Sequence, residues 1–120
     1  MIQTILVPLD GSPGSESVLP AVGELAATHG ARVRLLRVAT PPATVRIDGR
    51  VIAYADQETG RVELEELAYL RHAAAGLPGI EVERIVRFGE PAAEIVREAE
   101  SSRVDLITMK DGKPGSGVVY

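Results

Sequence analysis

The strongest constraint on this chain is the stretch from Thr4 to Pro13, TILVPLDGSP, in which an apolar run ends in a glycine turn. A short run with apolar residues on both sides is typical of a buried strand in a parallel sheet. Gly11 predicts a sharp turn or a close backbone approach, and Ser12 before Pro13 predicts the N-cap and first position of a helix. Ligands of open parallel sheets bind beyond the carboxyl ends of the strands, so the stretch predicts a binding site with Asp10 at its edge.

Strand and helix patterns alternate along the rest of the chain. The predicted strands span residues 4–9, 32–38, 80–88 and 104–109, and the predicted helices begin at about residues 13, 57 and 91. This alternation is typical of an α/β protein. It predicts one domain over residues 1–120, with an open parallel sheet, helices on both faces, four readable strands and no readable fifth strand.

Several local patterns refine this prediction. Pro20 lies inside the first helical stretch and predicts a kink or a later helix start. Residues 47–51 contain an Asp-Gly pair and predict either a small hairpin or a loop over the site. Residues 80–88 alternate between apolar and charged side chains, which favours the edge of the sheet. The apolar stripes of the later helices are predicted as Leu64, Leu67, Ala68 and Ala75, with Glu63, Glu65 and Glu66 facing water, and as Ala92, Ile95, Val96 and Ala99.

Composition excludes several classes of function. The chain has no cysteine, which excludes thiol catalysis, thiolate metal sites and disulfides, and which fits a cytoplasmic protein. No secretory signal is recognisable at the start, and no apolar run reaches membrane-spanning length. A net charge of −4 and few aromatic residues argue against nucleic acid as a partner. His29 and His72 lie far apart in the sequence, so no metal or catalytic role is predicted for them.

Four segments together resemble the universal stress protein family. They are residues 5–12 (ILVPLDGS), 35–38 (LLRV), 89–95 (GEPAAEI) and 104–109 (VDLITM), in the order and spacing of that family. The resemblance implies a sheet with strand order 3-2-1-4-5, a homodimer and, as in many members, an adenine nucleotide as cofactor, ATP or AMP with Mg²⁺. The cofactor-binding residues that it implies here are Pro8, Asp10, Gly11, Ser12, Val38, Met109, Gly112 and Gly115.

The C-terminal part of the sequence departs from the family pattern. Gly112 and Gly115 form the expected Gly-x-x-Gly, but the nine-residue spacer, the second Gly-Ser, the following helix and the fifth strand are not found. Pro114 also removes one N–H donor from this loop. We therefore expect weakened phosphate binding, and a fourth strand whose apolar edge needs a cover. Residues 118–120 (VVY) are predicted to pack on that edge or on a neighbouring chain.

Some candidate residues also have a plain structural interpretation. Asp10 either binds the ribose or adenine of a ligand or stabilises its own turn. Ser12 is either a phosphate contact or modification site, or a helix N-cap. Gly112 and Gly115 either contact a phosphate or belong to a flexible tail.

The function that the sequence predicts is a non-enzymatic binding and interaction module with unknown protein partners. We expect this module to bind an adenine nucleotide weakly or not at all. If it binds none, the protein has no cofactor. The alternative is an ATP-activating enzyme of a related fold, whose Ser-Gly-Gly-x-Asp-Ser loop residues 10–15 match only loosely. A phospho-receiver domain would need an Asp at the end of the third strand, where this chain has Arg87-Phe88-Gly89.

Overall fold

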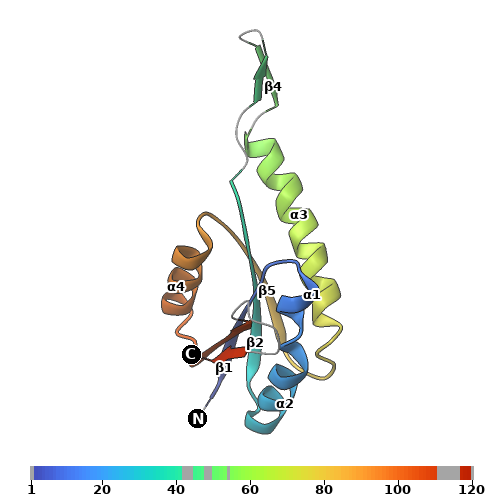
Figure 1. Ribbon diagram of the computed structural model, residues 1–120, viewed down its shortest axis with the longest axis vertical. Helices are drawn as coiled ribbons and strands as arrows, with labels where there is room; N and C mark the ends of the chain where they lie inside the picture. The colour runs from blue at the N-terminus through green and yellow to red at the C-terminus, as the bar shows by residue number, and fades with distance from the viewer. Residues whose placement is uncertain (1, 42–44, 48–49, 54, 111–116, 120) are drawn as a thin grey trace.

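The computed structural model describes residues 2–41, 45–47, 50–53, 55–110 and 117–119 (Figure 1). Its main sheet has the order β5-β2-β1-β6-β7, and β3 and β4 form a separate pair. The strands are β1 (Thr4–Leu9), β2 (Arg32–Ala39), β3 (Val45–Ile47), β4 (Arg50–Ala53), β5 (Val82–Phe88), β6 (Leu106–Lys110) and β7 (Gly117–Val119). The helices are α1 (Pro13–Glu16), α2 (Leu19–His29), α3 (Ala55–Ala74) and α4 (Pro91–Ser101).

The predicted open parallel sheet is confirmed. β1 pairs in parallel with β2 and with β6, and β2 pairs in parallel with β5. The four predicted strands therefore have the order 3-2-1-4, and the alternating strand β5 lies at an edge as its pattern indicates. All four strands end at the same edge of the sheet, which is where a ligand site of this fold is expected.

The other edge differs from the four-strand prediction, because the short strand β7 covers β6. β7 runs antiparallel to β6 and pairs Val119 with Thr108 and Gly117 with Lys110. The prediction that the C-terminal residues pack on this edge is confirmed for Val118 and Val119, whereas Tyr120 lies outside the described residues. An added strand satisfies backbone groups that an open edge would leave unpaired.

The first helical stretch is broken in two, at the place where Pro20 predicts a kink or a later start. α1 begins after the N-cap Ser12, and α2 begins at Leu19 with Pro20 in its first turn. Proline costs little there because the first N–H groups of a helix have no partner within the helix. α2 ends at Gly30, whose φ of 64° is the left-handed conformation of a helix C-cap.

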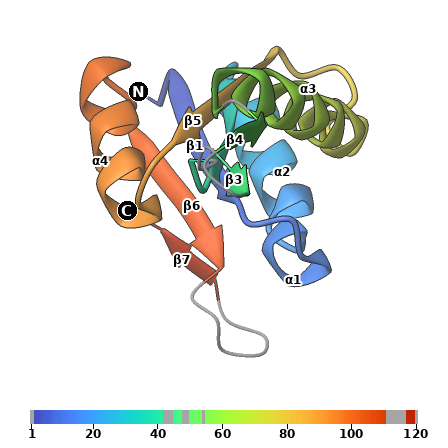
Figure 2. The same cartoon turned by 90° about the horizontal axis from the view of Figure 1, so that it is seen from above.

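The helices cover the two faces of the sheet unequally (Figure 2). α2 and α3 lie on one face, over a large apolar cluster that includes Ile5, Val33 and Leu70. α4 lies on the other face, over a small cluster of Leu6, Leu36 and Val38. The prediction of helices on both faces is therefore confirmed.

The predicted apolar stripe of α3 is wrong for Leu64, Ala68 and Ala75. Leu64 is 71% exposed, and Ala68 and Ala75 are exposed as well, whereas Leu70 and Ala73 are buried. Leu70 and Ala73, three residues apart, pack on the apolar cluster of the sheet, so the buried face of α3 is turned away from the predicted stripe. Glu66 does not face water freely either, because it pairs with Arg37 on β2.

The predicted stripe of α4 is correct only for Ile95 and Ala99. Val96 is 52% exposed and Ala92 is exposed, whereas Glu94 and Glu98 are buried. The helix is rotated about its axis so that two carboxylates face the sheet. The reason lies in the arginines that they meet there, which are described below.

Of the two predictions for residues 47–51, a small hairpin or a loop over the site, the hairpin is confirmed, because β3 and β4 pair in antiparallel fashion. Its turn residues, Asp48 and Gly49, lie outside the described residues. The hairpin extends from the sheet beside the start of α3, and the molecule measures 57 × 28 × 26 Å (Figure 1). No helix within the described residues is long and apolar enough to cross a membrane.

Candidate ligand-binding site

A pocket of about 160 Å³ lies at the carboxyl ends of β1, β2 and β6. α1 and α4 contribute its sides, so the pocket occupies the place where open parallel sheets bind ligands. Most of the residues that line it are apolar. The lining residues are Pro8, Leu9, Asp10, Ser15, Leu36, Arg37, Val38, Pro91, Ile95, Met109 and Lys110.

The turn after β1 is held by hydrogen bonds among Asp10, Ser12 and Ser15. Oδ1 of Asp10 accepts from the backbone N–H of Ser12 at 2.9 Å and from its hydroxyl at 2.5 Å. Oγ of Ser12 accepts from the N–H of Ser15 at 3.1 Å, which confirms the predicted N-cap. Asp10 therefore stabilises its own turn, which is the structural role predicted for it.

The Asp10 carboxylate also remains suited to a ligand. The hydrogen bonds from the Ser12 hydroxyl and N–H hold the pKa of Asp10 below its usual range, so the group is ionised at neutral pH. Within the described residues, these bonds involve Oδ1 alone. The exposed side chain therefore has an acceptor oxygen, Oδ2, for a hydroxyl or N–H group of a bound molecule.

Arg37 of β2 is one of the pocket residues, and its guanidinium lies toward α3 and the first turn. Its Nε lies 2.7 Å from Oε2 of Glu66, and its Nη1 donates to the carbonyl of Val38 at 2.7 Å. A Cβ atom at Gly11 would lie 3.9 Å from both Nε and Nη2 of this guanidinium. Gly11 itself has a φ of +88°, which favours glycine and lets the turn pass beside the arginine.

The wall opposite α1 is formed by Pro91 and Ile95 at the start of α4. Oε2 of Glu90 accepts from the N–H of Ala93 at 2.8 Å and caps the helix. Gly89 precedes it with a φ of 151°, and a Cβ there would come within 2.8 Å of Oε2 of Glu94. The close packing of this turn fixes where α4 begins, and thereby the position of the pocket wall.

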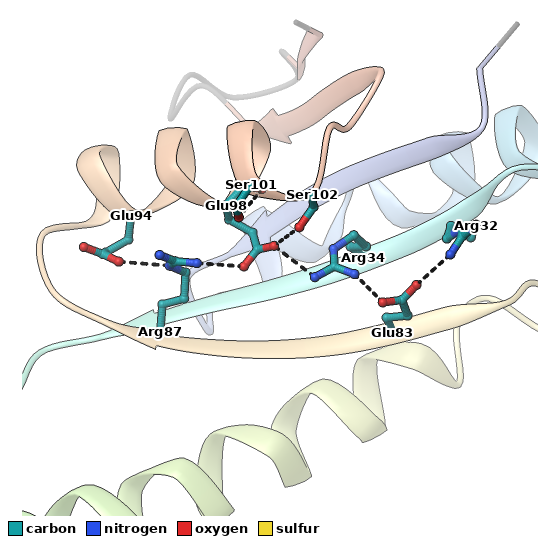
Figure 3. Close-up of polar contacts among 8 residues, drawn as sticks. All are labelled: Arg32, Arg34, Glu83, Arg87, Glu94, Glu98, Ser101 and Ser102. Carbon is teal, nitrogen blue, oxygen red and sulfur yellow. Dashed lines mark hydrogen bonds and ion pairs between the residues drawn. The ribbon is translucent and has the colours of Figure 1, made fainter.

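Ion pairs attach α4 to the strands beneath it (Figure 3). Arg87 on β5 lies 2.9 Å from Oε1 of Glu94 and 3.0 Å from Oε1 of Glu98. Arg34 on β2 lies 2.9 Å from Oε2 of Glu98. The chain of charges continues from Arg34 through Glu83 to Arg32.

Both α4 carboxylates are ionised because of these partners. Hydrogen bonds from Arg87 lower the pKa of Glu94. Burial opposes ionisation of Glu98, but hydrogen bonds from Ser102, Arg87 and Arg34 outweigh it and lower its pKa as well. The pocket wall formed by α4 therefore depends on charge pairs as well as on apolar packing.

The structure brings together four of the predicted site residues. Pro8, Asp10, Val38 and Met109 line the pocket. Gly11 and Ser12 form the turn next to it, and Gly112 and Gly115 lie outside the described residues. Within the described part of the chain, no group of three His, Cys, Asp or Glu side chains is placed to hold a metal ion.

Sequence reasoning missed Arg37 as a pocket residue, along with Pro91 and Ile95. A signal for Arg37 exists, because it interrupts the apolar run of β2 directly before the predicted site residue Val38. Pro91 and Ile95 belong to a segment that resembles the family, but that resemblance indicates a helix start and gives no role in a site. Lys110, the last residue of β6, lines the pocket too.

An open parallel sheet with helices on both faces defines an α/β domain, and the pocket lies at the edge where ligands of such sheets bind. Residues 1–115 match the family described as the Universal stress protein family, and the chain belongs to this family. The predicted resemblance is thereby confirmed.

Individual relatives agree with this assignment. Universal stress protein YxiE of Bacillus subtilis (strain 168) is 31% identical over 116 residues, which cover 91% of this chain and 78% of the relative. The solved structure of the hypothetical protein MJ0577 has a TM-score of 0.76 at 26% identity and covers 97% of this chain and 80% of that one. A universal stress family protein of Arabidopsis thaliana, solved with AMP bound, has a TM-score of 0.55 at 17% identity and covers 86% of this chain and 72% of that one.

Proposed function

We propose that this universal stress protein is a non-enzymatic module that binds an adenine nucleotide in the pocket at the ends of β1, β2 and β6. The observation that carries the proposal is the convergence of Pro8, Asp10, Val38 and Met109 on one pocket. The Arabidopsis relative, which was solved with AMP bound, supports the choice of ligand.

The lining suits the parts of such a ligand. Its apolar side chains, from β2, α4 and β6, offer a surface for a flat base. The ionised Asp10 offers an acceptor for ribose hydroxyl groups, which are donors that a carboxylate binds well. The base and the sugar are therefore the parts that we expect the pocket to recognise.

We infer that a triphosphate is bound less well than this half of the ligand. A phosphate loop followed by a helix would offer free N–H groups to anions. In this chain β7 begins at Gly117, and its pairing with β6 commits backbone groups to the sheet. Pro114 contributes no N–H at all.

The absence of catalysis is also part of the proposal. The hydroxyl of Ser12 donates to Asp10 and accepts from the N–H of Ser15, and the hydroxyl of Ser15 donates to the carbonyl of Ser12. Both side chains thus stabilise the turn. β5 ends in Val86, Arg87 and Phe88, so it does not offer the aspartate of a phospho-receiver.

Calorimetric titration with AMP, ATP and adenosine, each with and without Mg²⁺, tests the proposal. We expect AMP to bind at micromolar concentration, about −8 kcal/mol, and ATP no more tightly than AMP. Asp10→Asn should weaken AMP and adenosine about tenfold, whereas Glu24→Gln, an exposed charge on α2, should change neither. Absence of binding with all three ligands, or release of phosphate from ATP, would contradict the proposal.

The homodimer that the resemblance implies stays a proposal as well. Sedimentation equilibrium measures this directly. A mass of one chain at all concentrations up to about 100 μM, a weak-dimer range on the affinity scale, would contradict it.

A further inference from the structure

The strand β6 pairs with two different neighbours along its length. Its first residues, Leu106 and Ile107, pair in parallel with β1. Its last residues, Thr108 to Lys110, pair in antiparallel fashion with β7. Within the described residues, the pairing of β6 with β1 does not continue beyond Ile107. The end of β6 next to the pocket therefore depends on β7 for its pairing.

Pro8 explains why the pairing of β1 with β6 stops there. The carbonyl of Gln3 accepts a hydrogen bond at 2.9 Å from the N–H of Arg32, the first residue of β2. The carbonyl of Thr4 accepts one at 3.0 Å from the N–H of Asp105, directly before β6. Because successive residues of an inner strand direct their backbone groups to opposite neighbours, Pro8 faces β6 as Thr4 does. Proline has no N–H, so the ladder bond from Pro8 to β6 cannot form.

Met109 lies on the part of β6 beyond this break and lines the pocket. Ile107 packs against the apolar cluster on the α4 face. Side chains two residues apart on a strand lie on the same face, so Met109 shares that face with Val38 and Ile95, which also line the pocket. Pro8 lines the pocket from the β1 side of the break. The pocket is thus located where β1 and β6 cease to pair.

We propose that β7 positions the β6 side of the pocket, so that ligand binding and the pairing of β7 with β6 stabilise each other. The inference rests on the proposed function, because it concerns the same pocket and its nucleoside ligand. β7 acts through Met109 and needs no contact with the ligand itself. A strand as short as Gly117–Val119 forms few ladder bonds and opens readily. A ligand that contacts Met109 in its paired position therefore favours the paired state.

Calorimetric titration of the full chain with adenosine tests the inference. Val118→Pro together with Val119→Pro removes two N–H groups from β7 and should weaken adenosine binding about tenfold. The matched control is Val51→Pro together with Ile52→Pro in β4, which pairs with β3 in the separate sheet. This control should leave adenosine binding within about twofold of the unaltered protein. Unchanged binding in the β7 variant, or an equal loss in the control, would overturn the inference.

Hydrogen exchange on the unaltered protein gives a second measurement that needs no substitution. Coupling between two equilibria is reciprocal, so the effect of β7 on adenosine binding implies an equal effect of adenosine on the pairing of β7. Saturating adenosine should therefore slow the exchange of the β7 amide hydrogens about tenfold. The amides of β4, which exchange through opening of a separate hairpin, should be unaffected. No slowing in β7, or the same slowing in β4, is the contrary result.

Pro8→Ala tests the physical reason for this dependence on β7. The substitution restores an N–H group that faces β6, so pairing with β1 can continue and β7 contributes less. In this background the two prolines of the β7 variant should weaken adenosine binding by less than about threefold. A loss as large as in the presence of Pro8 contradicts the inference. An unaltered protein that does not bind adenosine contradicts the proposed function, and the inference with it, whereas binding that is independent of β7 contradicts the inference alone.

Discussion

The two faces of the sheet are covered by different chemistry. On the α2 and α3 face, Ile5, Val7, Val33, Leu35 and Leu70 are fully buried in one continuous apolar cluster. On the α4 face, among the described residues, the buried apolar cluster consists of Leu6, Leu36 and Val38, with five half-buried apolar residues packed against it. A line of ion pairs also joins α4 to the strands (Figure 3). One sheet is thus attached to its helices by hydrocarbon on one side, and by hydrocarbon together with ion pairs on the other.

The two faces should respond differently to pH and to salt. Apolar burial does not depend on protonation, whereas ion pairs weaken with acid and with salt. Glu94 and Glu98 are only 6% and 4% exposed, so their charges must be matched by Arg87 and Arg34. The packing of α4, which forms one wall of the pocket, should therefore weaken in acid and at high salt.

The largest expected loss of stability comes from a substitution on the apolar α2 and α3 face. Leu70→Ala removes a fully buried side chain and should lower the free energy of unfolding by about 2–5 kcal/mol. Urea denaturation measures it. Leu64→Ala on the same helix is the control, because Leu64 is 71% exposed and its loss should cost within about 0.5 kcal/mol. Equal costs at the two positions would show that α3 does not pack as described.

A smaller effect is expected from breaking the charged face. Glu98→Ala leaves Arg34 without one partner and Arg87 with Glu94 alone, and should cost about 1–3 kcal/mol in urea denaturation. The double variant Arg34→Met with Glu98→Leu replaces the central pair by apolar groups. It should recover most of that loss, because hydrocarbon often substitutes for a buried pair without cost. A double variant less stable than Glu98→Ala would contradict this account.

The smallest expected effect is a change in how the free energy of unfolding depends on pH. The pKa values of Glu94 and Glu98 in the folded protein lie below the ordinary value of 4.5. Their stabilisation is therefore present above about pH 4.5 and is lost as the pH falls through the lowered values. We expect the free energy of unfolding to decrease between pH 6 and pH 3 less steeply in the Glu94→Gln, Glu98→Gln variant than in the unaltered protein.

Two other carboxylates also make the stability depend on pH, so the pH slopes of the two proteins must be compared with each other. Asp10 has a lowered pKa through hydrogen bonds from Ser12, and Asp105 through those from the N–H groups of Gln3 and Thr4. Both lose stabilisation in acid, but they do so equally in the two proteins. An identical pH slope with and without the two glutamates would mean that the α4 ion pairs do not contribute to folding.

The strands and their order could be predicted because their signals are local or belong to the family resemblance. The run 4–9, its turn and the alternation of 80–88 need no knowledge of distant residues. The face of α4 needs such knowledge. Ile95 and Ala99 are found by periodicity, but Glu94 and Glu98 resemble a solvent-facing side until Arg34 and Arg87 are placed opposite them.

The candidate site shows the same division. Pro8, Asp10 and Val38 follow from their places at strand ends and from the resemblance. Arg37 could not be predicted in this way, because an arginine within a strand indicates a solvent-exposed face unless its partner is known. That partner, Glu66, comes from a helix whose predicted register placed it in water. Interactions between elements far apart in the chain are what the sequence alone did not determine.

The elongated outline of the molecule has a consequence for how it rotates in solution. The long dimension of 57 Å is about twice the other two, and α3 runs along it (Figure 1). The N–H bonds of a helix are parallel to its axis, so those of α3 reorient mainly by slow end-over-end tumbling. The N–H bonds of β2 point across the same axis and also sense the faster spinning motion. Nitrogen-15 relaxation should therefore give α3 a longer apparent correlation time than β2.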